Sequence, residues 1–425
     1  MHLTSQDGTA LAERYAGVRA HTERLAAPLT PEDQTVQSMA DVSPTKWHRA
    51  HVTWFFETFL LAEHVADFRP FADQYWFLFN SYYEAVGPRY ARPMRGVVSR
   101  PGAHEVGVYR RDVDGRVGEL LTTADDGTLD KLRPVLELGF HHEQQHQELM
   151  LMDIKHVFSL NPLHPVYDGA PAGPGGPAHP GPTGWCDVEG GLVEVGSDGA
   201  GFAFDNELPR HQQWLAPYRL ADRLVTNAEW LDFIADGGYR RPELWLSDGW
   251  ARATQEGWQA PLYWVQQDGS WHEHTLHGTG PVDPGRPVCH VSHYEADAFA
   301  TWAGKRLPTE AEWEHAAATL SSVDNGVGTD RWHPGPAPAA GAGGGLRQMS
   351  GDCWQWTSSA YLPYPGFVRP DGAIGEYNGK FMSAQMVLRG GSVLTPPGHA
   401  RDTYRNFFPA GARWPVTGVR LADGG

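Results

Sequence analysis

Cysteine is scarce in this sequence. Among 425 residues there are three, which are Cys186, Cys289 and Cys353. Their odd number and wide spacing give no disulfide framework, and none belongs to the CxxC motif of a metal site. Isolated thiols are typical of a reducing compartment. We therefore predict a cytoplasmic protein whose fold does not depend on disulfide bonds.

The chain also lacks an excess of positive charge and any long apolar run. It has 34 lysine and arginine residues against 51 aspartate and glutamate residues, a formal net charge of −17. No basic run stands out, which disfavours nucleic acid and anionic membranes as partners. The sequence has no stretch of about 18 uninterrupted apolar residues and no signal-peptide pattern at its N-terminus, so we expect a soluble protein.

Aromatic residues, in contrast, are abundant, with 17 Trp, 15 Tyr and 17 Phe. Such residues suit rigid pockets, including pockets that hold cationic groups. The length of 425 residues predicts two or three domains, each with its own core.

The first half is organised around residues 138–152, LGFHHEQQHQELMLM. Good helix formers and recurring apolar residues predict a helix from about 129 to 157. Its residues His142 and His146 are four apart, so both imidazoles leave one face at a spacing that can hold a metal ion. Two ordinary surface or core histidines would show the same spacing, and a metal site needs a further ligand.

A candidate for that ligand is His51. Ser43 followed by Pro44 is a helix-start signal, with Ser43 as the expected capping residue. On the helix that follows, His51 shares an apolar face with Trp47 and Trp54. A single histidine on such a face is more often a core residue than a ligand, so the pattern leaves both readings open.

Two more helices are expected, over residues 8–28 and, from a weaker pattern, over 103–126. Four helices with ligands pointing inward describe a bundle with a metal site in its core. Gly-Pro and Arg-Pro steps within residues 75–100 predict a loop that carries arginines beside tyrosines. Near a metal, these arginines would form a carboxylate clamp; otherwise they form a solvated basic loop.

The second half differs from the first in composition and in the elements that it predicts. Residues 162–184 are mainly Pro, Gly, Ala and His, which predicts a linker between a helical domain at 1–161 and a second domain at 185–425. Short strands, glycines and tryptophans then predict an α+β domain. Its expected elements are a strand–turn–strand at 188–196, helices at 225–234 and 292–303, and a low-complexity loop at 333–345.

Several motifs resemble known families. The segments 304–314 (GKRLPTEAEWE), 354–359 (WQWTSS) and 388–392 (LRGGS) resemble the formylglycine-generating-enzyme or sulfatase-modifying-factor domain, which is related to C-type lectins. The segments 43–51 and 142–146 resemble a DinB-like four-helix bundle. In this order, and over nearly the whole chain, they are similar to the sulfoxide synthases of ergothioneine biosynthesis (EgtB). The resemblance implies a multidomain fold with α and α+β parts.

The resemblance also implies a cofactor and a reaction. Family members hold a non-haem Fe(II) ion on three histidines, which match His51, His142 and His146. With O2, they join the sulfur of cysteine or γ-glutamylcysteine to imidazole C2 of hercynine (Nα-trimethylhistidine) and oxidise the sulfur to a sulfoxide. Three neutral imidazoles leave about three positions of an octahedral shell open for these reactants.

A further implication concerns the phenol that directs the reaction away from plain thiol dioxygenation. In a subset of the family this role resembles that of the paired tyrosines in Asn-Ser-Tyr-Tyr-Glu, here Tyr82 and Tyr83. A positioned phenol can donate a proton during such a reaction. Other members use a tyrosine from the C-terminal domain, for which Tyr377 is the candidate; its surrounding motif differs, and we rank it below the pair.

Substrate contacts are implied in the same way. Asn406 and Phe407 match the segment that surrounds the quaternary ammonium of hercynine, and Gln145 matches a residue that bonds its imidazole or carboxylate. Ordinary core packing is the alternative for Phe407.

The sulfur donor's carboxylate would meet Arg89 and Arg92, with Arg95 in reserve. Members that use γ-glutamylcysteine carry an acidic residue where this chain has Phe408. We therefore favour free cysteine as the donor.

Other functions stay open. A true formylglycine-generating enzyme would need paired cysteines for copper. A metal-binding bundle fused to a lectin-like module would lack oxygen chemistry, and a selenium-using relative that makes selenoneine shares the architecture. The remaining nearby histidines, His48, His141 and His156, are expected to lie outside the ligand set.

Overall fold

The computed structural model describes residues 6–170, 173, 175–176, 181–328, 330–339, 345–371 and 374–424. The chain divides into two compact units, Met1–Tyr167 with Pro370–Tyr377, and Asp168–Arg369 with Asn378–Gly425. The first unit therefore includes a short segment from far along the sequence. Parts of the expected linker at 162–184 and of the expected loop at 333–345 lie outside the described residues.

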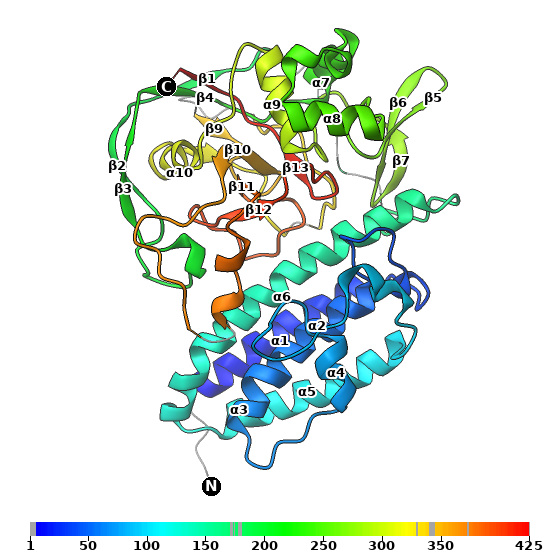
Figure 1. The fold of residues 1–425 in the computed structure, drawn as a ribbon, viewed down its shortest axis with the longest axis vertical. Coiled ribbons are helices and arrows are strands. Elements are labelled where there is room, and N and C mark those ends of the chain that lie inside the picture. The colour runs from blue at the N-terminus through cyan, green and yellow to red at the C-terminus, as the bar shows by residue number, and fades with distance from the viewer. Residues whose placement is uncertain are drawn as a thin grey trace. The chain divides into compact units, whose positions relative to one another are not determined.

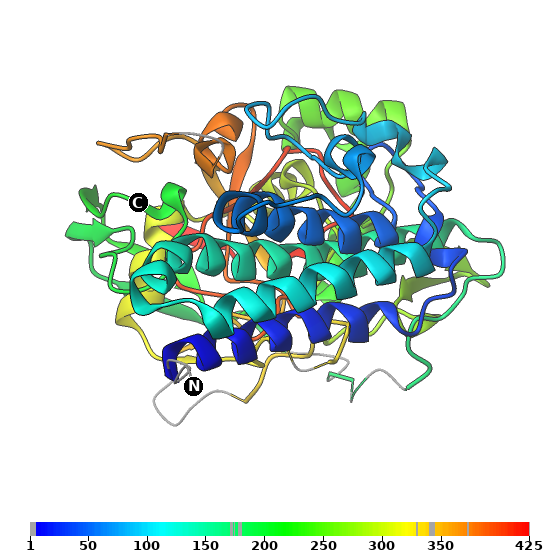
Figure 2. The same ribbon diagram turned by 90° about the horizontal axis from the view of Figure 1, so that it is seen from below.

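The first unit is a helical bundle. Its four main helices are α1 (Gln6–Ala26), α2 (Thr45–Phe56), α5 (Ala103–Thr123) and α6 (Asp126–Leu160). Helix α1 packs on α5 and α6, and α2 packs on the same two helices, as Figures 1 and 2 show. The shorter helical segments are η1 (Asp33–Thr35), η2 (Glu57–Leu61), α3 (Ala62–His64), α4 (Asp73–Leu78) and η3 (Arg92–Val97). The four expected helices are thus present.

Helix ends differ in detail from the sequence-based expectations. Helix α6 starts at Asp126 because the Asp125 side chain accepts a hydrogen bond from the Thr128 N–H at 2.7 Å. The prediction that Ser43 caps α2 is wrong, since no side chain caps this helix. The Ser43 hydroxyl instead accepts a hydrogen bond from Arg95 at 2.9 Å, so this side chain makes a tertiary contact in place of a helix cap.

The second unit contains several small sheets. The largest has the order β12-β11-β10-β13, and Figure 1 shows helices beside it. Its strands are β10 (Trp354–Ala360), β11 (Met386–Arg389), β12 (Asn406–Phe408) and β13 (Thr417–Gly418). A second sheet joins β1 (Trp185–Val188), β4 (Tyr218–Ala221) and β14 (Ala422–Gly424). The others join β2 (Gly191–Val195) with β3 (His211–Leu215), β5 (Trp264–Gln267) with β6 (Ser270–Thr275) and β7 (Gly278–Pro281), and β8 (Ser322–Val323) with β9 (Leu346–Arg347).

The described residues of the second unit also form four α-helices, which are α7 (Asn227–Ala235), α8 (Ser247–Glu256), α9 (His293–Trp302) and α10 (Glu310–Thr319). The helices expected at 225–234 and 292–303 are α7 and α9. Capping boxes begin α7, α9 and α10, and Thr226, Ser292 and Thr309 are the capping residues. The strand–turn–strand expected at 188–196 is present only in part, because β2 lies within this range but β1 reaches it only at Val188, and the two strands belong to different sheets.

The motifs at 304–314 and 388–392 form part of the core. The Glu310 carboxylate accepts from Arg405 Nε at 2.8 Å and from Arg389 Nη2 at 3.1 Å. Arg389 also pairs with Glu314 at 2.8 Å. All four side chains are buried, so these charge pairs hold β11 and the residue before β12 against α10.

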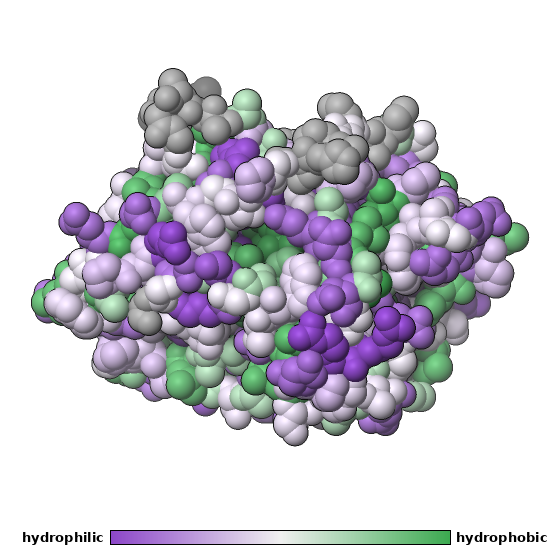
Figure 3. Space-filling model, turned by 90° about the horizontal axis from the view of Figure 1, so that it is seen from above, coloured by the Kyte–Doolittle hydropathy of each residue, from purple (hydrophilic) through white to green (hydrophobic). Residues whose placement is uncertain are grey.

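Within the described residues, no helix is long and apolar enough to cross a bilayer. On the face drawn in Figure 3, hydrophilic and hydrophobic residues alternate over short distances.

Candidate metal centre

Three histidines converge in the core of the first unit. His51 comes from α2, and His142 and His146 come from α6; one ligand atom from each lies within 4.8 Å of the others. The Nε2 atoms of His51 and His142 are 3.1 Å apart. His51 and His142 are buried, and His146 is half-buried. The structure thus brings together the three residues that the sequence analysis selected as ligands.

The orientation of His51 is fixed from behind. Its Nδ1 lies 2.6 Å from the carbonyl oxygen of Phe79, so the Nδ1–H donates to that carbonyl. Nε2 then carries the lone pair and faces His142. Trp47 stacks on the imidazole with ring centroids 4.7 Å apart. Such an outer hydrogen bond selects the tautomer that a metal requires.

His146 is held by a chain of two hydrogen bonds that runs through His48 to Asp153. Its Nδ1 lies 2.8 Å from Nδ1 of His48, and Nε2 of His48 lies 2.9 Å from Oδ2 of Asp153. The carboxylate accepts from His48, so His48 accepts in turn from the Nδ1–H of His146. This assignment leaves the lone pair on Nε2 of His146 available for a metal. The hydrogen bond at Nδ1 also makes the imidazole a stronger metal ligand. His48 therefore lies behind the ligand set, and Asp153 is a positioning residue that the sequence did not indicate.

The three imidazoles are neutral at neutral pH. Burial lowers the pKa of His142 to about 3. Burial and neighbouring histidine charges also lower the pKa values of His51 and His146 well below 6.5. Neutral imidazole is the form that binds a metal. Converging neutral nitrogens, two of them with the opposite ring nitrogen hydrogen-bonded, fit a divalent transition metal.

A buried ion network supports the helix that carries two of the ligands. Glu143, next to His142, accepts from Arg19 at 2.9 Å, from Arg110 at 3.1 Å and from Thr22 at 2.6 Å. Burial works to raise the pKa of Glu143, but Arg19 and Arg110 outweigh it and hold the pKa at about 2. The network fixes α6 against α1 and α5. Its partners lie far away in the sequence, which is why the motif alone does not show it.

A tyrosine from the second half of the sequence lies against the histidines. Tyr377 belongs to the first unit, and its ring packs edge-to-face on His142 with centroids 5.7 Å apart. Its hydroxyl donates to Oε1 of Gln145. Tyr82 lies beyond it, with centroids 6.1 Å apart, and stacks in turn on Tyr83 at 4.6 Å. Tyr377, which the sequence analysis ranked second, is thus in ring contact with a candidate ligand.

The neighbouring Glu376 fastens this segment to the bundle. Its carboxylate accepts from the backbone N–H groups of Glu84 at 3.1 Å and Ala85 at 2.9 Å. These residues directly follow Tyr82 and Tyr83, so one carboxylate holds the three tyrosines in one group. Nothing in the local pattern around Glu376 predicts this contact.

The arginines of the loop occupy different environments. Arg89 and Arg92 are exposed; Arg89 pairs with Glu84 at 2.9 Å, and Arg92 donates to the carbonyl oxygen of Asp41. Arg95 is buried, and its guanidinium lies 3.3 Å from the ring centroid of Trp47. Burial and the charge of Arg92 lower the pKa of Arg95 to about 8. The reserve candidate Arg95 is therefore the arginine that packs on Trp47, the ring that stacks on His51.

The expected hercynine contacts Asn406 and Phe407 belong to β12 of the second unit. Oδ1 of Asn406 accepts from the N–H of Phe407 at 2.9 Å. Phe407 stacks on Tyr361 with centroids 4.0 Å apart, and Phe381 lies at 6.0 Å. Phe407 is half-buried. These rings form an aromatic surface of the kind that holds a cationic group.

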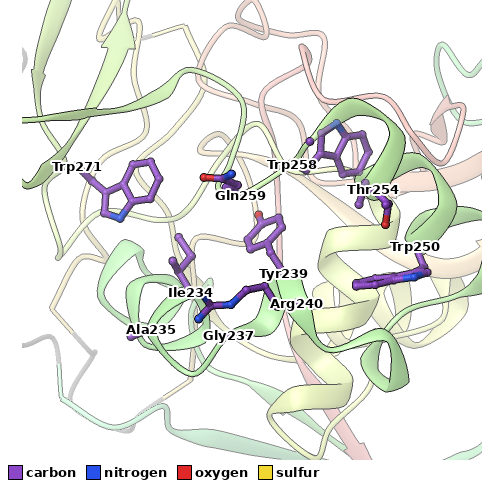
Figure 4. Close-up of a pocket in the computed structure, with 12 residues that line it drawn as sticks. Ile234, Ala235, Gly237, Tyr239, Arg240, Trp250, Thr254, Trp258, Gln259 and Trp271 are labelled. Carbon is purple, nitrogen blue, oxygen red and sulfur yellow. The ribbon is translucent and has the colours of Figure 1, made fainter.

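A separate cavity of about 620 Å³ also lies in the second unit. Figure 4 shows Trp250 and Trp271 on opposite sides of it, with Tyr239 between them. None of the site residues expected from the sequence lines this cavity.

Known proteins are similar to the second half of this chain alone and to most of its length. Residues 182–424 match the sulfatase-modifying factor enzyme 1-like domain family. A hercynine oxygenase of Mycolicibacterium smegmatis is 37% identical over 330 residues, which cover 69% of this chain and 74% of that protein. One from Mycolicibacterium thermoresistibile is 37% identical and covers 66% and 67%. A formylglycine-generating enzyme of Streptomyces coelicolor is 30% identical and covers 53% and 82%.

The second unit and its motifs thus define a sulfatase-modifying-factor type of protein preceded by a helical bundle. The chain belongs to the hercynine oxygenase family, and it is an oxidoreductase. The predicted family and fold class are confirmed.

Proposed function

We propose that this protein is an Fe(II)- and O2-dependent sulfoxide synthase of ergothioneine biosynthesis that joins the sulfur of cysteine to C2 of hercynine. The observation that carries the proposal is the convergence of His51, His142 and His146 in a member of the hercynine oxygenase family. These three imidazoles would hold a ferrous ion, which would bind and activate the thiolate and dioxygen.

Tyr377 is the proposed proton donor. Its ring contact with His142 and its hydrogen bond to Gln145 hold the phenol at the edge of the histidine cluster. Tyr82 and Tyr83 lie behind it in a stacked pair whose hydroxyl oxygens are 3.5 Å apart. Burial raises the pKa of Tyr83 well above its ordinary value, so this phenol keeps its proton. Of this pair, the Tyr82 ring packs against Tyr377.

Replacing Tyr377 by Phe is expected to shift the product from hercynyl-cysteine sulfoxide toward cysteine sulfinate by about tenfold or more, since a positioned acid is lost. Tyr82→Phe should change the ratio less, because that ring meets Tyr377 rather than a histidine. Mass spectrometry of both products measures the ratio. A larger shift in Tyr82→Phe than in Tyr377→Phe would return the role to the tyrosine pair.

Arg95 is the proposed partner of the donor carboxylate, in preference to the exposed Arg89 and Arg92. It is buried beside Trp47, which itself stacks on His51. Its pKa of about 8 keeps the guanidinium mainly charged at neutral pH. A buried guanidinium binds a carboxylate more strongly than a solvated one.

Arg95→Ala is expected to raise the KM for cysteine about 10- to 100-fold, the loss of a charged hydrogen bond, with a smaller change for hercynine. Arg89→Ala serves as the control, because Arg89 is exposed and pairs with Glu84. Steady-state kinetics with each substrate varied in turn, at equal iron content, measures the difference. Equal effects on both substrates would argue for a purely structural Arg95.

The quaternary ammonium of hercynine cannot donate hydrogen bonds, so aromatic faces must hold it. We assign this role to Phe407 and its stacked neighbour Tyr361, with Asn406 offering an amide dipole. Family members that use γ-glutamylcysteine carry an acidic residue at the position of Phe408, where it would contact the glutamyl group. Phe408 at this position therefore favours free cysteine over γ-glutamylcysteine as the donor.

The test is anaerobically iron-loaded protein given hercynine and O2, with cysteine, γ-glutamylcysteine or a selenium donor in parallel reactions. Mass spectrometry should find hercynyl-cysteine sulfoxide from free cysteine. A selenium adduct alone would move the reaction to selenoneine formation. No adduct with any donor would favour a metal-binding module without oxygen chemistry.

A further inference from the structure

The second unit contains another cluster of metal-type ligands. Glu273 lies on β6, Cys289 follows β7, and His333 lies between β8 and β9. All three are buried, and one ligand atom from each lies within 4.8 Å of the others. The Nε2 atom of His333 is 2.8 Å from Oε1 of Glu273. None of these residues belongs to the histidine cluster of the first unit.

The chemistry of this cluster differs from that of the first. It combines a thiol, an imidazole and a carboxylate, and these are the ligand types that Zn²⁺ accepts. A thiolate and a carboxylate together carry two negative charges, which a divalent cation would neutralise in a buried place where unpaired charge is costly. On binding, the Cys289 thiol loses its proton to solvent and its sulfur binds the metal.

The backbone beside two of these residues adopts an unusual conformation. His290, next to Cys289, has φ +61°, and Trp332, next to His333, has φ +52°. Non-glycine residues seldom occupy this left-handed region, and where they do the surrounding structure enforces it. Two such positions beside two members of one buried cluster favour a built site over a chance meeting of side chains.

We infer that Glu273, Cys289 and His333 form a second, structural site for a borderline divalent cation such as Zn²⁺. Zinc lies about 2.0–2.3 Å from such ligands, so two ligands of one tetrahedral ion are about 3.3–3.7 Å apart, and the 2.8 Å pair of His333 and Glu273 would open slightly around the ion. The bound ion would join the sheet β5-β6-β7 to the irregular stretch that carries His333. This site is independent of the iron proposal, since it lies in the other unit.

Cobalt(II) distinguishes the two sites, because only a site with cysteine gives a thiolate-to-cobalt charge-transfer band. The probe is Co²⁺ alone, added to the metal-free 425-residue chain and to its His142→Ala variant. We expect one equivalent with the thiolate band in both proteins. The band should be lost in Cys289→Ala and kept in Cys353→Ala, another buried cysteine of the same unit.

Thiol protection in the unaltered protein covers the case in which Cys289→Ala does not fold. Bound Co²⁺ or Zn²⁺ should slow alkylation of Cys289 at least tenfold and leave Cys186 unchanged, as read by peptide mass spectrometry. The inference is overturned if no thiolate band forms, if the band survives in Cys289→Ala, or if the metal protects no thiol or only Cys186 or Cys353.

Discussion

His142→Ala is expected to abolish both iron binding and turnover. The imidazole is buried, neutral and 3.1 Å from the ligand atom of His51. Two remaining histidines would bind a divalent ion far more weakly than three, because each ligand adds to the affinity of the same site. Iron content after desalting and product formation from hercynine measure the two losses.

His141→Ala is the matched control, since His141 is the adjacent residue on the same helix and is also buried. It should keep its iron and most of its turnover. Full turnover in His142→Ala, or equal loss of iron in both variants, would refute the assignment of His142 as a ligand.

Glu143→Ala is expected to lower the free energy of unfolding by about 3–5 kcal/mol, since it leaves Arg19 and Arg110 buried without their shared carboxylate. Glu137→Ala on the same helix is the control. It removes a pair between Glu137 and the exposed Arg14, so the expected loss is about 1 kcal/mol or less. Urea denaturation of the metal-free proteins measures both values.

The same carboxylate predicts acid sensitivity. Its folded pKa of about 2 is depressed from 4.5. The stabilisation is therefore fully present above pH 4.5 and is lost as the pH falls from there toward 2. Equal stability of Glu143→Ala and Glu137→Ala, or a loss in Glu143→Ala that is the same at pH 7 and pH 3, would contradict the role of this network.

The bundle helices that carry the candidate ligands were predictable because their signals are local, whereas the choice of His51, His142 and His146 as one ligand set came from the family resemblance. A spacing of four residues puts His142 and His146 on one helix face, and an apolar stripe places His51 toward a core. Capping boxes at Thr226 and Ser292 mark helix starts in the same short-range way. Such patterns depend on neighbours a few residues apart, which the sequence displays directly.

The remaining parts of the site depend on contacts across long sequence separations. Asp153 acts on His146 through His48, and Glu376 acts on the backbone after Tyr83. Ser43 was expected to cap α2 but accepts a hydrogen bond from Arg95 instead. In each case a tertiary partner decides the role of a side chain, and no local pattern names that partner.

The segment Pro370–Tyr377 has a consequence for the order of events on the ribosome. Tyr377 is translated more than two hundred residues after His146, which takes on the order of 10–50 s at about 5–20 residues per second. During that interval a nascent bundle has its three histidines but not the phenol that packs on them. Under the proposed function, the metal would be acquired first, and control of the oxygen chemistry by Tyr377 would wait until the segment Pro370–Tyr377 is made.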